Sequence, residues 1–179
     1  MDQDTAMDRE EKMRILRDRA VKLAREEHAV SLSEEIEVCE FMLDREKYGI
    51  ESRYIREVYP LKRFTQVPCT PSHVVGVINV RGQILSIIDI GRFFDLQRKG
   101  LSDLNKVIIL HSPGMEFGIL ADEIIGVTRR PVDQLESSLP TLNDIRADYL
   151  KGVTRDRLII LDAAKILTDE KLIVNEEVK

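Results

Sequence analysis

The sequence contains no tryptophan, only two cysteines and three histidines, and aromatic residues make up 5% of it. So few aromatic side chains offer few platforms for stacked bases, and a net charge of -5 gives no attraction to a polyanion. We therefore expect no nucleic-acid partner. A chain of 179 residues can bury a core without a disulfide, so we expect Cys39 and Cys69 to be reduced thiols in a reducing compartment.

Long apolar runs are also missing. No run approaches the roughly 20 residues that a membrane-spanning helix needs. The sequence starts with Met1, Asp2, Gln3 and Asp4, and no basic segment leads into an apolar one as in a secretory signal. We expect a cytoplasmic protein without direct membrane insertion.

The common catalytic and ligand-binding motifs are absent as well. The chain has no G-x-x-x-x-G-K-S/T or G-x-G-x-x-G phosphate loop, no G-x-S-x-G and no H-E-x-x-H. His28, His73 and His111 are scattered, and Cys69 with His73 is a single pair where a structural zinc site usually has four ligands. We expect no catalytic residues, no metal site and no cofactor.

The sequence does have enough apolar residues, 43%, to bury a core, and its length predicts one main folding unit. The first residues differ in character, because Met13, Leu16 and Ala20 recur at three- and four-residue spacing amid dense charge. This pattern predicts an amphipathic helix. We expect a charged helical extension over residues 1–33 and the main unit over 34–179. The extension could dock on the body, pair with another chain or remain a frayed tail.

The main unit reads as a series of short strands that repeats. A shift of 69 residues superposes Tyr48-Gly49-Ile50 on Phe117-Gly118-Ile119, and the apolar positions around them match in order. Each half supplies about five short strands, which predicts a small β-barrel for each half and a mostly β fold. The expected strands are Ile36–Leu43, Tyr48–Ile50, Tyr54–Val58, Val74–Val80, Ile84–Ile90, Val107–Leu110, Glu116–Leu120, Ile124–Thr128 and Leu158–Leu161.

Two aspartates follow corresponding strands of the repeat. Asp89 and Asp162 each precede a short stretch that predicts a single helical turn or short helix, so their expected role is to cap it. A catalytic carboxylate pair is the alternative. Nothing else in the sequence supplies a nucleophile, a base or a substrate-orienting motif for it, so we favour capping.

The most informative stretch runs from Gly76 to Ile90, where two apolar strands are joined by a polar turn. Gly82 can adopt positive φ at this turn at little cost. We expect Val77 to be buried in the first strand, and Arg81 to lie at the end of a rigid hairpin. There its planar guanidinium could engage a carboxylate on a partner or on this same protein, or could simply be solvated.

The same stretch resembles the CheW family pattern G-V-x-N-L-R-G-x-I-x-P-[IV]-[IV]-D-L. The resemblance extends from about Glu35 to Leu167. It implies two small SH3-like five-stranded β-barrels side by side, related by pseudo-symmetry, which agrees with the repeat. Val80 and Ser86 depart from the pattern, which usually has Leu and Pro at these positions. Without this proline the strand regains a backbone donor, which can alter an edge that partners use.

The resemblance implies a non-catalytic adaptor that couples chemoreceptors to the histidine kinase CheA at membrane-associated receptor arrays. Its partners would be the tip of a receptor's cytoplasmic helical hairpin and the regulatory domain of CheA. The family's receptor-binding residues match Glu57 and Arg81, with Ile55, Val58 and Gly76 lining the neighbouring surface. Two alternatives stay open: a CheW-like scaffold in a non-chemotaxis two-component pathway, and an unrecognised enzyme or small-ligand binder that uses the cleft between barrels.

Overall fold

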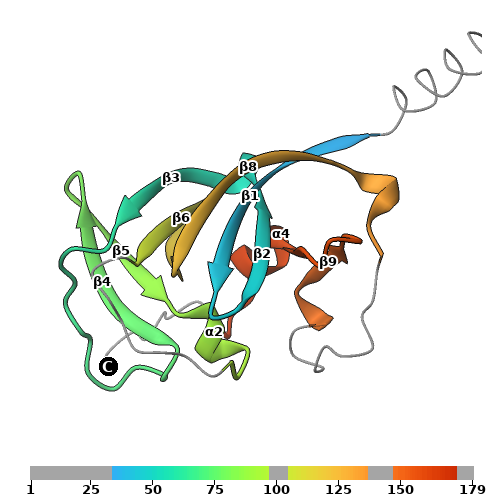
Figure 1. Ribbon diagram of the computed structural model, residues 1–179. Coiled ribbons are helices and arrows are strands. Elements are labelled where there is room, and N and C mark those ends of the chain that lie inside the picture. The colour runs from blue at the N-terminus through green and yellow to red at the C-terminus, as the bar shows by residue number, and fades with distance from the viewer. Residues whose placement is uncertain (1–33, 97–104, 137–146, 173–179) are drawn as a thin grey trace, which may run out of the picture. The chain divides into compact units, whose positions relative to one another are not determined.

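The computed structural model describes residues 34–96, 105–136 and 147–172, which form two five-stranded sheets with a few short helices (Figure 1). The mostly β architecture predicted from the sequence is confirmed. The helix expected over residues 1–33 lies outside the described residues, so the boundary before residue 34 stays a prediction.

The order of the elements shows the internal repeat directly. The first half contains β1 (Glu35–Leu43), β2 (Glu46–Glu51), the 3₁₀ turn η1 (Ser52–Tyr54), β3 (Ile55–Pro60), β4 (Val74–Val80), β5 (Gln83–Ile88) and α2 (Ile90–Phe93). The second half contains β6 (Lys106–Ser112), β7 (Met115–Ala121), β8 (Glu123–Pro131), η2 (Val132–Gln134), β9 (Leu150–Val153), β10 (Ile159–Leu161) and α4 (Ala163–Thr168). All nine expected strands are present, and β9 adds a four-residue strand that the sequence patterns did not single out.

The connectivity differs from the expectation that each half forms its own barrel. One sheet has the order β8-β1-β2-β10-β9 and the other β3-β6-β7-β5-β4, so each takes strands from both halves. Val58 of β3 pairs with Ile108 of β6, and Val38 of β1 pairs with Thr128 of β8. An alternating apolar pattern determines which face of a strand is buried, but it does not determine which strand becomes its neighbour.

The two sheets share one large hydrophobic cluster, and two smaller clusters lie apart from it. The shared cluster combines Phe41 and Tyr48 of the first sheet with Ile108 of the second and with Phe94 after α2. The Tyr48 ring lies between two others, with its centroid 6.2 Å from that of Phe41 and 6.5 Å from that of Phe94. Tyr149, which precedes β9, packs on Phe94 from the second half. Because both halves contribute to this cluster, the two sheets form a single packing unit.

Both aspartates predicted to cap helices do so. An Asp89 carboxylate oxygen accepts a hydrogen bond from the Arg92 backbone amide at 3.1 Å, and Asp162 accepts one from the Lys165 amide at 3.1 Å. Each bond satisfies a donor that the first turn of a helix leaves without a partner, an effect of about 1 kcal/mol. Helix capping is therefore the structural role of both aspartates.

Strand β4 does not bury the residue that the sequence suggested. Val77 is only partly buried, whereas Ile78 and Val80 are 3% and 1% exposed. The pairing of β4 with β5 shifts register between Val74 and Gly76, which marks a bulge. A bulge adds one residue to one strand and so reverses which side chains face the core beyond it. The expected burial of Val77 is therefore wrong by one position.

A buried carboxylate ties β8 to β1. Glu40 is 5% exposed and accepts hydrogen bonds from Thr128 Oγ1 at 2.5 Å and from Arg130 Nη2 at 2.6 Å. Burial alone would raise the pKa of Glu40, but these two hydrogen bonds and the Arg130 charge outweigh it and hold the pKa below its ordinary value of 4.5. Arg130 also lies 3.3 Å from Asp156, so the β9–β10 turn joins the same network.

Replacing Glu40 by Gln is expected to lower the free energy of unfolding by about 1 to 3 kcal/mol at pH 7. A folded-state pKa below the unfolded one contributes stability above pH 4.5, and that stability is lost as the pH falls through the folded value. The difference between wild type and Glu40→Gln should therefore shrink below pH 4.5 in urea denaturation from pH 7 to pH 3. Glu37→Gln, at an exposed position of the same strand, is the control. A difference independent of pH would contradict this role of Glu40.

Candidate partner-binding site

The candidate site is built on the turn between β4 and β5. Val80 pairs with Gln83, which leaves Arg81 and Gly82 as a two-residue turn with φ values of 53° and 89°. Positive φ at both central positions is typical of a type I′ turn, whose twist matches that of the strands. The Gly82 amide donates to Asn79 Oδ1 at 2.8 Å. The turn therefore holds Arg81 at the tip of a tight hairpin, as the sequence predicted.

The structure brings Arg81 together with Glu57 of β3, the other charged residue expected in the site. Arg81 Nη2 donates to Glu57 Oε2 at 3.0 Å, while the Arg81 side chain remains 81% exposed and that of Glu57 is 21% exposed. Exposed ion pairs contribute only about 0 to 1 kcal/mol to stability. The pair therefore positions the guanidinium while leaving most of it open to a partner.

Glu57 belongs to a larger polar network on the same sheet. Arg56 Nη2 lies 3.2 Å from Glu57 Oε1, and Arg56 also forms an ion pair with Glu116 of β7. Gln83 closes the network, because its oxygen accepts from Arg56 at 2.9 Å and its Nε2 donates to Glu116 at 2.6 Å. The sequence reasoning missed Arg56, Gln83 and Glu116. Glu116 comes from the other half of the chain, and only the strand exchange brings it here.

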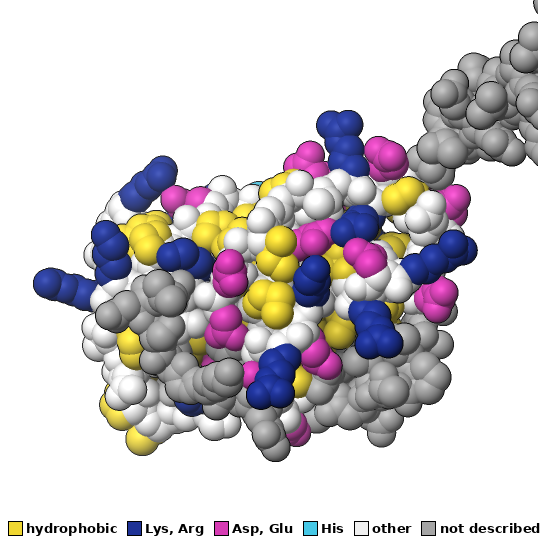
Figure 2. All heavy atoms as spheres, viewed as in Figure 1, with side chains coloured by type: hydrophobic (Ala, Val, Ile, Leu, Met, Phe, Trp, Pro, Cys, Tyr) yellow, Lys and Arg dark blue, Asp and Glu magenta, His cyan; other side chains and the backbone are white. Residues whose placement is uncertain are grey.

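Apolar side chains accompany the charges. Val58 of β3 is 40% exposed, whereas Ile55 is partly buried and packs against the shared core. Ile84 is 62% exposed, and the sequence reasoning missed it as a site residue. Its cross-strand partner is the exposed Asn79, so the alternation of the hairpin would have placed Ile84 on the outer face. Figure 2 shows hydrophobic side chains exposed among charged ones on one face of the molecule.

Gly76 does not lie on the surface, contrary to the expectation that it lines the site. It is buried at the β4 bulge with a φ of 147°, and an added Cβ would lie 2.2 Å from the Thr65 carbonyl oxygen. Thr65 pairs there with Val77 through two backbone hydrogen bonds of 2.8 and 2.9 Å. Only glycine lets the two backbones approach so closely, so the role of Gly76 is to shape the hairpin.

Substitution of Gly76 by Ala is expected to lower the free energy of unfolding by about 2 to 4 kcal/mol, because positive φ and a clash with backbone act together. Gly114→Ala is the matched control, since Gly114 also has positive φ, 86°, but an added Cβ would meet no atom within 4 Å. It should cost about 1 kcal/mol. Urea denaturation of both variants measures the difference, and equal losses would rule out the close approach as the cause.

Metal sites and membrane-spanning helices were the other features to look for in the described parts of the chain. Among residues 34–96, 105–136 and 147–172, no three His, Cys, Asp or Glu side chains gather as a metal site would require. Within the same ranges, no helix has the length and apolar character to cross a bilayer.

Comparisons with protein families, with related proteins and with solved structures all give matches over most of the chain. A family model described as the CheW-like domain matches residues 37–171. The chemotaxis protein CheW of Thermotoga maritima is 32% identical over 151 residues, covering 80% of this chain and 94% of that protein. The CheW protein of Treponema pallidum is 29% identical over 146 residues, covering 78% and 86%. The crystal structure of the scaffolding protein TtCheW from Thermoanaerobacter tengcongensis has a TM-score of 0.64 at 28% identity and covers 72% of this chain and 84% of that one.

Proposed function

The chain belongs to the CheW family of chemotaxis scaffolds, and on this premise we propose that it couples chemoreceptors to the histidine kinase CheA without catalysing a reaction. Its proposed partners are the tip of a receptor's cytoplasmic helical hairpin and the regulatory domain of the kinase. The proposed location is the cytoplasm, with recruitment to membrane-associated receptor arrays.

The observation that carries the receptor assignment is the Arg81–Glu57 pair at an exposed hairpin tip. Arg81 Nη2 lies 3.0 Å from Glu57 Oε2, yet 81% of the Arg81 side chain is exposed. The ion pair therefore orients the guanidinium and leaves it accessible to a partner. Val58 and Ile84 add exposed apolar area on the strands that hold the pair. A receptor helix can place apolar side chains on such a surface while the charges at its rim determine register. Ile55 supports this surface from beneath, and Gly76 shapes the hairpin.

Affinity purification from a lysate of the source organism, with the tagged full chain as bait and mass spectrometry of what is retained, tests the coupling role. We expect a histidine kinase and a chemoreceptor to be recovered together. A kinase recovered with regulators of another pathway and no chemoreceptor would favour the non-chemotaxis scaffold. A receptor recovered without any kinase would contradict coupling.

A further inference from the structure

One part of this acidic protein is entirely free of acidic residues. From Val58 to Ile88 the sequence contains Lys62, Arg63 and Arg81 but no Asp or Glu, although the whole chain has a net charge of -5. These residues form the second half of β3, the connection after it and the β4–β5 hairpin. This region therefore carries local positive charge on a protein whose average charge is negative.

The connection between β3 and β4 runs beside β4, where Thr65 pairs with Val77 in an antiparallel bridge. A hollow lies on each side of this bridge. One hollow has a volume of about 910 Å³ and combines two cations with two partly buried aromatic rings. Its lining includes Tyr59, Lys62, Arg63, Phe64, Val77 and Asn79.

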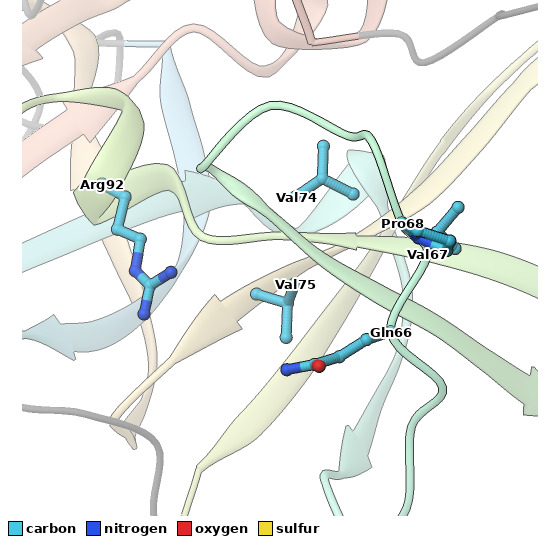
Figure 3. Close-up of a pocket in the computed structure, with 6 residues that line it drawn as sticks. All are labelled: Gln66, Val67, Pro68, Val74, Val75 and Arg92. Atoms are coloured by element: carbon cyan, nitrogen blue, oxygen red, sulfur yellow. The ribbon is translucent and has the colours of Figure 1, made fainter.

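The second hollow, of about 440 Å³, is lined by four apolar residues together with the Gln66 amide and the Arg92 guanidinium (Figure 3). Arg92 is anchored there, because its Nη1 donates to the Ser72 carbonyl oxygen at 3.2 Å and its Nε lies 3.4 Å from Asp89. Val67 exposes 39% of its surface at the edge. The full lining is Gln66, Val67, Pro68, Val74, Val75 and Arg92.

The internal repeat shows that the fold does not need cations at this place. In the second half, β8 ends at Pro131 as β3 ends at Pro60, and Glu136 pairs with Val153 as Thr65 pairs with Val77. The corresponding segment of the second half carries the opposite charge. Counting from the two prolines, Asp133 and Gln134 occupy the positions of Lys62 and Arg63.

Lys62 and Arg63 are exposed, and neither forms an ion pair with another residue among those the structure describes. Cations that neither stabilise the fold nor neutralise a neighbouring carboxylate remain available to a partner. Aromatic, Arg and apolar side chains beside them are typical of the centre of a protein interface.

We propose that the segment from Lys62 to Pro68, with the hollow on each side, is a docking surface for an acidic segment of another protein. Aliphatic or aromatic side chains of that segment would occupy the hollows, and its carboxylates would pair with Lys62, Arg63 and Arg92. Two open, separate hollows suit a polypeptide with spaced anchors. The surface does not include the Arg81–Glu57 pair. A test of this docking surface is therefore independent of the receptor assignment.

Binding of a designed peptide to the full chain tests the proposal. The probe is a fluorescein-labelled peptide of Glu and Leu, compared by fluorescence anisotropy with versions in which Ser replaces Leu or Lys replaces Glu. We expect only the Glu and Leu peptide to bind, and the double variant Lys62→Glu/Arg63→Glu to weaken binding at least about tenfold. Arg45→Glu/Lys47→Glu, at exposed cations of the β1–β2 hairpin, is the control and should change affinity less than about twofold.

Other outcomes would overturn the proposal. Equal binding of the Ser version would show attraction to any polyanion, and unchanged binding by the double variant would exclude this surface. If charge reversal disturbs folding, the double variant Lys62→Gln/Arg63→Gln replaces it, and we expect a smaller loss of peptide affinity. Sedimentation of the chain alone provides a last check. If it self-associates and Asp133→Lys/Glu136→Lys abolishes this, the occupant is a second copy and not a different protein.

Discussion

Replacing Arg81 by Glu is expected to weaken binding to a receptor's helical hairpin at least tenfold, equivalent to about 1.4 kcal/mol, without unfolding the protein. The side chain is 81% exposed and its ion pair with Glu57 is at the surface, so little stability depends on it. Reversing its charge places two carboxylates, those of residue 81 and Glu57, where a partner's carboxylate would otherwise bind. Titration of the purified chain with a soluble receptor hairpin measures the affinity, and circular dichroism checks the fold.

Two further variants separate the functions of the pair. Arg157→Glu is the matched control, because Arg157 is also an exposed turn arginine with positive φ, 63°, but lies before β10. It should leave the affinity unchanged. The exchange Arg81→Glu with Glu57→Arg restores the internal ion pair in reverse. If the pair matters only for the shape of the hairpin, the exchange will bind normally. If Arg81 contacts the partner, the exchange will remain defective.

Replacing Ile78 by Asp should prevent stable folding, a larger effect than we expect from Glu40→Gln or Gly76→Ala. Ile78 is 3% exposed in a cluster with Leu85, Ile87 and Ile109. A carboxylate there would be buried without a partner, at a cost of several kcal/mol, or would have to be protonated. That loss is a large part of the roughly 5 to 15 kcal/mol that stabilise an ordinary domain.

Val77→Asp provides the comparison that tests the bulge. Val77 is partly buried on the other side of the strand, beside the hollow that Lys62 and Arg63 line, so its carboxylate can remain solvated. We expect a folded protein with a loss of about 1 to 2 kcal/mol. Urea denaturation followed by circular dichroism distinguishes the two variants. A cooperatively unfolding Ile78→Asp together with an unfolded Val77→Asp would show that the register described for β4 is wrong.

Local features of this fold could be predicted from the sequence because they depend on neighbouring residues. Arg81-Gly82 between two apolar strands predicts the tight turn, and an aspartate before a short helix predicts a cap, as at Asp89. The repeat could be found because matching apolar positions lie in matching order. The turn and the caps are each determined within a few residues, and the repeat needs only a comparison of one half of the sequence with the other.

The rest depends on contacts between distant segments. The bulge lies at Gly76, where the Thr65 backbone makes a close approach. The residues next to Gly76 in the sequence do not predict this contact. The Arg56–Glu116 pair requires β3 and β7 to share a sheet, although a simple reading of the repeat assigns them to different barrels. Pairing between remote strands is a property of the whole chain and is not visible in a local pattern.

The exchange of strands between halves has a consequence for the growing polypeptide. As the chain is synthesised, β1 and β2 emerge long before β8, β9 and β10, and β3 to β5 emerge before β6 and β7. Neither sheet has all its strands until the second half has been made, and β9 and β10 complete the first sheet last. The first half must therefore wait with unpaired strand edges, which are prone to aggregation. A ribosome that stops halfway therefore releases no folded module, because each sheet needs strands from both halves.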